Sequence, residues 1–182
     1  SSALRWSTAI QRGGAIYQEG DTLRLTSTRI EHCEAYIHGG GIASMGAVVL
    51  IDQSSMSENT AGGNGGVLYL NGGAAVVNAT TMENNYASGN GGAVSSSAGT
   101  GLVVSESTFN DNRASSGGAI DNAGALTLTS STLSGNTADN NGGGLRSTGS
   151  ASSDFSTIAF NHSAQGGRAH VSGSFIPRST IF

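Results

Sequence analysis

Two short motifs recur along the chain in a fixed phase, and this repetition restricts the fold more than any other feature. The first motif is a Gly-Gly pair followed by a small residue and an aliphatic residue. The second is Ser or Thr, a large apolar residue, two variable residues and Asn. A period of this length is typical of solenoids and propellers. The Gly-Gly copies begin 24–26 residues apart, at Gly13, Gly39, Gly65, Gly91, Gly117, Gly142 and Gly166.

Each repeat contains three short segments with alternating apolar residues, separated by residues that favour turns. One segment follows Gly-Gly, one carries an aliphatic pair such as Val49 and Ile51, and one carries the Ser/Thr-apolar motif. No window shows the 3.6-residue period of a helix. We therefore expect an all-β, right-handed parallel β-helix of about seven coils, with three strands in each coil, because parallel crossovers strongly prefer that hand.

The recurrent polar and glycine residues have structural roles in such a coil. Gly-Gly is expected where a tight turn needs positive φ or leaves no room for a Cβ. The recurrent Asn is expected to form a ladder within one turn, its amide bonding to the same group one coil away and to nearby backbone. Cys33 stands where the first copy should have Asn. The ladder residues are Asn59, Asn85, Asn112, Asn136 and Asn161.

The phase of the repeat extends to both ends of the sequence. Counting back one period places Leu4 at the core position of Ile30, and Ser179-Thr180-Ile181 resembles Ser156-Thr157-Ile158. The whole sequence, residues 1–182, is thus one domain that starts and stops within a coil. We expect its partners to be further coils of the same chain or second copies stacked end to end, as in a filament.

Composition excludes several classes of protein. The single Cys excludes a disulfide scaffold, and the Gly residues lack the three-residue period of collagen. No apolar run is long enough to span a membrane. A net charge of −4 with scattered Arg residues argues against a nucleic-acid-binding surface.

Both motifs resemble the Gly-Gly-Ala-Ile and Phe-x-x-Asn repeats of chlamydial polymorphic outer-membrane proteins. Gly117-Gly118-Ala119-Ile120 and Phe109 with Asn112 match them literally. The resemblance implies an extracellular or cell-surface location and adhesion to a host or cell surface, or to glycans. It also implies the parallel β-helix fold, since the motif itself is structural.

An enzyme is the first alternative, because β-helices also carry sites that cleave polysaccharides. The candidate residues are Glu58, Glu83 and Asp111, which precede the Asn position by one or two residues, as Glu31 precedes Cys33. Stacked in adjacent coils, such carboxylates suit an acid/base pair or a Ca²⁺ site in a lyase or hydrolase resembling pectate lyase. A solvated turn edge explains the same residues. The four His residues show no metal-ligand spacing.

An ice-binding face is the second alternative. The position four residues before each Asn is occupied by Ser or Thr, which a half-buried strand also favours. The neighbouring outward column is mixed and includes Gln53, Glu106, Phe155 and Arg178. The hydroxyl-bearing column consists of Ser55, Thr81, Thr108, Thr132, Thr157 and Thr180.

Two N-glycosylation sequons occur, at Asn78 and Asn161. The repeat phase directs Asn78 outward and places Asn161 in the buried ladder. In a eukaryotic source we therefore expect a glycoprotein that is modified at Asn78 only. Altogether the sequence favours a non-enzymatic extracellular β-helix without a metal or cofactor, either a segment of an adhesin or the subunit of a fibre.

Overall fold

The computed structural model describes residues 2–182 and arranges them in four parallel sheets of seven strands each. We number the sheets I to IV in the order in which one coil visits them after its Gly-Gly pair. Sheet I contains β3 (Ile16–Glu19), β7 (Ile42–Met45), β11 (Leu68–Asn71), β15 (Val94–Ser96), β19 (Ile120–Asn122), β23 (Leu145–Ser147) and β27 (Ala169–Val171). Sheet II contains β4 (Thr22–Thr26), β8 (Val48–Asp52), β12 (Ala74–Asn78), β16 (Gly101–Ser105), β20 (Ala125–Thr129), β24 (Ser150–Asp154) and β28 (Ser174–Arg178).

The other two sheets carry the second motif and the segment that follows it. Sheet III contains β1 (Ser2–Arg5), β5 (Thr28–Glu31), β9 (Ser55–Ser57), β13 (Thr81–Glu83), β17 (Thr108–Asn110), β21 (Thr132–Ser134) and β25 (Thr157–Ala159). Sheet IV contains β2 (Thr8–Ala9), β6 (Glu34–Ala35), β10 (Thr60–Ala61), β14 (Tyr86–Asn90), β18 (Arg113–Ser116), β22 (Thr137–Asn141) and β26 (His162–Gln165).

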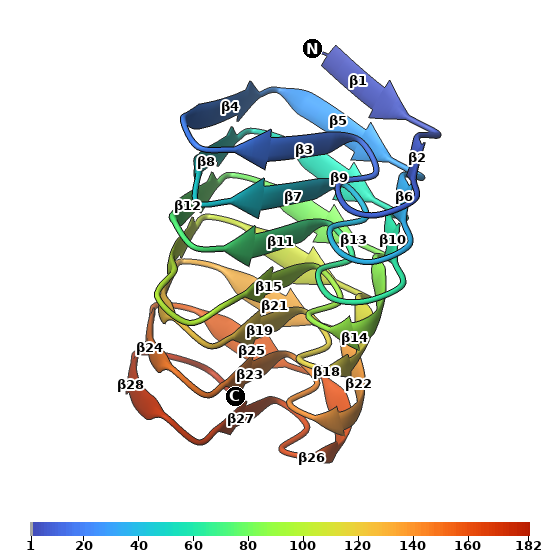
Figure 1. Cartoon of the computed structure of the whole chain (residues 1–182). Coiled ribbons are helices and arrows are strands. Elements are labelled where there is room, and N and C mark those ends of the chain that lie inside the picture. Colours follow the sequence, from blue (N-terminus) through green and yellow to red (C-terminus); the bar gives the residue numbers. More distant parts are fainter. Residues whose placement is uncertain (1) are drawn as a thin grey trace.

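The chain winds as a solenoid of about seven coils, so the all-β solenoid expected from the repeat is confirmed. Figure 1 shows the coils stacked from the N-terminal end to the C-terminal end, with each sheet forming one wall. Each residue pairs with its counterpart one repeat later, as Val77 does with Val104. Every wall is therefore a set of columns in which equivalent residues lie one strand spacing apart, about 4.8 Å.

The prediction of three strands per coil is wrong, because each coil has four. The missing strand is the one in sheet IV, between the Asn and the Gly-Gly pair. It escapes the alternation test because β6 and β10 are only two residues long and each points a single small residue, Ala35 or Ala61, into the interior. The longer strand β14 also has one inward Ala, Ala87, after which its register with β18 shifts. One inward Ala gives no two-residue period to detect.

The core consists of columns of apolar side chains that run the length of the solenoid. Sheet III contributes the large column that includes Met56, Met82 and Phe109, all with no exposed surface. Sheet II contributes the aliphatic pairs and sheet I a column that includes Leu68 and Ile120. Because equivalent apolar side chains stack in adjacent coils, each coil buries its interior against the next, which no single coil could achieve alone.

The Asn ladder is present at the bend between sheets III and IV, as expected. The Oδ1 atom of Asn85 accepts hydrogen bonds from the backbone N–H of Asn59 at 2.9 Å and from its Nδ2 at 3.1 Å. The same Nδ2 donates to the carbonyl of Ile30 at 3.0 Å. Cys33 begins the column, and its N–H donates to Oδ1 of Asn59. The ladder thus satisfies backbone groups that the bend would otherwise leave buried and unpaired.

A second ladder, made of hydroxyl groups, occupies the bend between sheets II and III. Ser107 shows the pattern: its Oγ accepts from the N–H of Thr80 at 3.1 Å and donates to the carbonyl of Ser105 at 2.6 Å. These hydroxyls lie five residues before the Asn position in every coil. The column consists of Thr28, Ser54, Thr80, Ser107, Ser131 and Ser156.

The Gly-Gly pairs form the corner between sheets IV and I, and the two glycines have different reasons to be there. The first of each pair has positive φ, as Gly65 does at +70°. The second lies against the next coil, and a Cβ on Gly66 would stand 2.0 Å from the carbonyl oxygen of Gly92. All seven first glycines, Gly13, Gly39, Gly65, Gly91, Gly117, Gly142 and Gly166, adopt positive φ.

The two ends of the solenoid differ in how well the repeat phase places them. Leu4 pairs with Ile30, as the phase predicts. At the other end the predicted alignment is wrong by one residue, because Thr157 pairs with Ile181 instead of Thr180. The Thr180 hydroxyl donates to the carbonyl of Arg178, so Thr180 continues the hydroxyl ladder. The predicted alignment implies a last repeat of 23 residues, whereas the pairing of Thr157 with Ile181 makes it 24 residues long.

Candidate functional site

The carboxylates proposed for the enzyme alternative lie along the edge between sheets III and IV but in two different columns. Glu58 and Asp111 occupy the bend position with positive φ, where Asn84 separates them in the intervening coil. Glu83 lies on the outer face of sheet III, in register with Ser57 and Asn110. The expected row of stacked carboxylates is therefore interrupted by amide and hydroxyl side chains.

Glu58 and Asp111 each contact a polar side chain, whereas Glu83 has no such contact among the described residues. An oxygen of Glu58 lies 3.2 Å from Nδ1 of His32, and Asp111 accepts a hydrogen bond from the Asn110 amide at 2.6 Å. Among residues 2–182 no group of three or more His, Cys, Asp or Glu side chains is placed to hold a metal ion. The Ca²⁺ and acid/base hypotheses thus rest on residues that the fold places near one edge without joining them in one cluster.

The hydroxyl column proposed for ice binding runs up the outer face of sheet III. Ser55, Thr81, Thr108, Thr132 and Thr157 are paired in register on successive strands. Thr180 is not part of this column, because Ile181 pairs with Thr157. The column that was expected beside it also changes: residues such as Gln53 and Phe155 occupy a bend with positive φ, where Ser179 replaces Arg178.

The sequon residue Asn78 is half-buried on the outer face of sheet II and both ends of its amide are engaged. Its Nδ2 donates to Asp52 at 2.7 Å, and its Oδ1 accepts from the Ser105 hydroxyl at 2.8 Å. The sequon hydroxyl, Thr80, is buried in the hydroxyl ladder. A glycan on Asn78 would have to replace these contacts. Asn161 is the last member of the buried Asn ladder.

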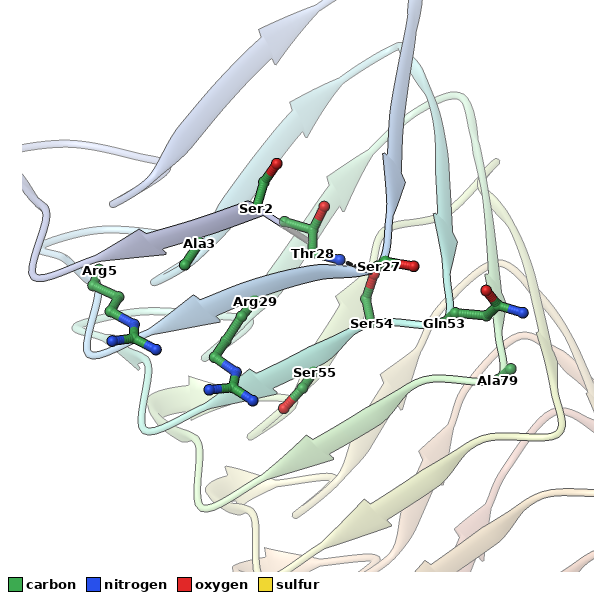
Figure 2. Close-up of a pocket in the computed structure, with 10 residues that line it drawn as sticks. All are labelled: Ser2, Ala3, Arg5, Ser27, Thr28, Arg29, Gln53, Ser54, Ser55 and Ala79. Carbon is green, nitrogen blue, oxygen red and sulfur yellow. Dashed lines mark hydrogen bonds between the residues drawn. The ribbon is translucent and has the colours of Figure 1, made fainter.

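A groove of about 490 Å³ lies where the outer face of sheet III meets the bend from sheet II. Figure 2 shows the side chains of Arg5 and Arg29 side by side on the neighbouring strands β1 and β5, with Gln53 and Ala79 on the bend at the opposite side. Five of the other residues that line the groove are Ser or Thr. The groove is lined by Ser2, Ala3, Arg5, Ser27, Thr28, Arg29, Gln53, Ser54, Ser55 and Ala79.

The two guanidinium groups of this groove share one carboxylate. Nε of Arg5 lies 3.0 Å from Oε2 of Glu31, and Nε of Arg29 lies 3.0 Å from Oε1 of the same residue. The Glu31 side chain is 16% exposed, whereas those of Arg5 and Arg29 are 47% and 54% exposed. The carboxylate therefore lies beneath two cations that face solvent, and the three groups together carry one net positive charge.

A buried ion pair marks the outer face of sheet I. Nη1 of Arg146 lies 2.7 Å from Oδ1 of Asp121, and the Asp121 side chain is only 9% exposed. Burial raises the pKa of Asp121, and the Arg146 guanidinium opposes that shift. Ser95 and His170 occupy the same column in flanking coils. The pair satisfies both charges within the wall of the solenoid.

Sequence reasoning did not find the groove or the ion pair, because neither lies at a recurrent position. Arg5 and Arg29 are 24 residues apart, and the repeat phase alone brings them onto adjacent strands. Counting charges along equivalent positions of neighbouring coils would have paired Arg5 with Glu31, which Arg29 precedes by two residues on the same strand. The same count would have paired Asp121 with Arg146.

Comparison with known proteins agrees with this architecture. The family model described as the right handed beta helix region matches residues 4–162, which is most of the chain. The chain belongs to this right-handed β-helix family. No curated protein and no solved structure gives a significant match to it.

Membership in the β-helix family accounts for the repeat, the parallel walls and the hand of the coil. A β-helix can host sites of very different chemistry, so the family name assigns no activity to the groove or to the ion pair. None of residues 2–182 forms a helix long and apolar enough to cross a membrane.

Proposed function

We propose that this β-helix is a non-enzymatic structural and adhesive segment of an extracellular protein, either a cell-surface adhesin of the polymorphic outer-membrane type or the subunit of a fibre. The observation that carries the proposal is that the recurrent residues all have a structural role. Asn, Ser/Thr and Gly-Gly all serve to join one coil to the next, through the two ladders and the close-packed corner. Such a design produces a stiff rod whose outer walls are free to vary and bind.

The partners we propose are further coils or further copies of the same β-helix. The backbone groups at the outer edge of a terminal coil can pair with another coil in the register that joins β12 to β16. A rod extended in this way keeps the same ladders across the junction. Electron microscopy of the purified chain tests this: a distribution of rod lengths supports association, and rods of a single short length contradict it.

Retention of coated beads tests the adhesive function. Beads carrying the folded chain would be washed over cultured cells and over immobilised polysaccharides at increasing shear. We expect them to be retained more strongly than beads carrying the heat-unfolded chain at the same density. Equal retention of the two on every surface would refute the adhesive proposal, because a function of the rod depends on its folded walls.

Two assays would replace this function with one of the alternatives. Cleavage of any polysaccharide in a broad panel, lost in Glu83→Gln, would establish the enzyme. Thermal hysteresis and ice shaping would establish the ice-binding face on sheet III, for which the in-register hydroxyls from Ser55 to Thr157 provide a regular column.

A further inference from the structure

The groove beside Arg5 and Arg29 has the chemistry of a binding site for an anion. Both arginines meet Glu31 through Nε, which leaves the terminal nitrogens of each guanidinium group for a ligand. A guanidinium presents these nitrogens as a planar fork that matches a carboxylate or sulfate group. Glu31 holds the two forks in place from below, so part of the ordering cost of binding is already met.

The rest of the groove is neutral and hydrophilic. Ser27, Gln53 and Ser55 line it with groups that can donate and accept, and their side chains make no hydrogen bond to any residue that the structure describes. Ala3 and Ala79 contribute only methyl groups to its lining. No carboxylate and no aromatic ring is found among the described residues that line it. Hydroxyl-rich ligands suit such a surface, whereas single-stranded nucleic acid usually needs aromatic rings for stacking.

The hydroxyl column of sheet III extends the groove along the solenoid. Ser55 lines the groove and is followed, one strand spacing at a time, by Thr81 and Thr108. Equivalent hydroxyls about 4.8 Å apart offer repeated contacts to a ligand that is itself a repeating chain. A polymer that anchors a charged group at the arginines can therefore continue over this wall, which a free anion cannot do.

We propose that this groove binds an anionic polysaccharide, with its sulfate or carboxylate group on Arg5 and Arg29 and its hydroxyl groups on Ser27, Gln53 and Ser55. The inference rests on the proposed adhesive function and names the ligand class. Its affinity should fall with added salt, because both guanidinium groups are solvent-exposed.

Affinity electrophoresis of the full chain through gels containing dextran sulfate, polygalacturonate or neutral dextran tests the proposal. We expect retardation by an anionic polymer and none by dextran. The double variant Arg5→Gln/Arg29→Gln should weaken that binding by about tenfold or more, as the loss of charge-assisted hydrogen bonds implies. Circular dichroism and thermal unfolding would establish that the variant is folded.

The control variant is Arg113→Gln. It removes one exposed Arg of sheet IV that pairs with Asp139 at 3.0 Å, away from the groove. We expect it to retain affinity within about twofold of the parent chain. Three results would overturn the proposal: equal losses in the control and the double variant, no binding of either anionic polymer, or tighter binding of single-stranded DNA than of both.

The choice of polymers separates the source of the anionic group. Retardation by dextran sulfate alone assigns the site to sulfate esters, and retardation by polygalacturonate alone assigns it to carboxylates. The bead assay keeps this inference distinct from the general one. If beads carrying Arg5→Gln/Arg29→Gln are retained as well as beads carrying the parent chain, the groove proposal fails and the adhesive proposal stands. If the gels show Arg-dependent retardation but the beads are not retained, the groove proposal stands and the adhesive proposal fails.

Discussion

Individual residues of the repeat differ in how readily the sequence reveals their role. The Asn ladder and the Gly-Gly corner are predictable because one residue type recurs at one position. The hydroxyl ladder has an equally regular signal, since Ser or Thr precedes every Asn position by five residues. It was missed because the adjacent position, from Ser55 to Thr157, also carries hydroxyls and only one of the two columns points inward.

The contact between coils at the Gly-Gly corner predicts a severe effect of Gly66→Ala. The new Cβ would stand 2.0 Å from the Gly92 carbonyl oxygen and within 3 Å of backbone atoms of Tyr86, and backbone atoms cannot move aside as a flexible side chain could. We expect a loss of about 3 kcal/mol or more in unfolding free energy, measured by urea denaturation. The control is Gly101→Ala, whose Cβ would meet nothing closer than 3.9 Å. It should be neutral or stabilise by roughly 0.5–1 kcal/mol, and similar losses in both would contradict this account.

The Asn ladder predicts a comparable effect of Asn112→Ala. The substitution removes donors to the Met82 carbonyl at 3.0 Å and to Asn136 at 2.9 Å, and the acceptor used by Asn85. Buried groups left unpaired should lower the unfolding free energy by about 3 kcal/mol. Asn84→Gly changes an exposed residue at the neighbouring bend and should cost less than about 1 kcal/mol. An equally mild effect at Asn112 would show that the ladder does not stabilise the fold.

Strands and turns were harder to predict than the repeat itself. The strands of sheets I to III carry large apolar residues at their inward positions and are visible in the sequence. Those of sheet IV have a small residue at the inward position, such as Ala61 or Ala87, where sheet III has a large apolar one such as Met82. The following turn contains a further polar column. There Nδ1 of His38 accepts from the N–H of Asn64 at 3.0 Å, and Oδ1 of Asn64 accepts from the N–H of Asn90 at 2.9 Å.

This turn column predicts a pH dependence that comes from His38. Burial, and then the positive charge of Arg12, lower the pKa of His38 from its usual 6.5. A lowered folded-state pKa means that the contribution to stability is complete above pH 6.5 and is lost as the pH falls through the folded-state pKa. Protonation would also remove the acceptor used by Asn64.

His38→Asn should abolish that loss, because Asn64 shows that an Asn at this position accepts the same bond. The measurement is the midpoint of urea unfolding from pH 7.5 downwards at constant ionic strength. Parent and variant curves that stay parallel through this range would rule out His38 as the cause.

At the scale of the whole molecule, the family and the number of coils follow from the sequence, but the binding surface does not. The repeat defines what every coil shares, whereas the groove depends on Arg5, Arg29 and Glu31, which occur once. Non-recurrent residues become neighbours only through the register, and an error of one residue, as at Thr180, moves a side chain to another column.

The stacked architecture predicts a gradient of local stability along the solenoid. Central residues such as Val77 and Phe109 have no exposed surface, whereas β1 is exposed throughout and β28 nearly so. Because each coil contacts only its neighbours, opening should start at the terminal coils. Amide hydrogen exchange should therefore be slowest in β12 and β16 and fastest in β1 and β28. Uniform protection along the chain would mean that the rod unfolds as one unit.

The ladders also give the rod a direction. At the Asn and hydroxyl bends, a backbone N–H of one coil always donates to a side chain of the coil after it, whereas at the His38 turn the N–H of the later coil donates to the earlier one. Turning the rod end for end would set donor against donor and acceptor against acceptor. Any lengthening must therefore proceed head to tail, so an assembly of these β-helices would be a vectorial filament with two chemically unlike tips, able to grow and to be recognised differently at each.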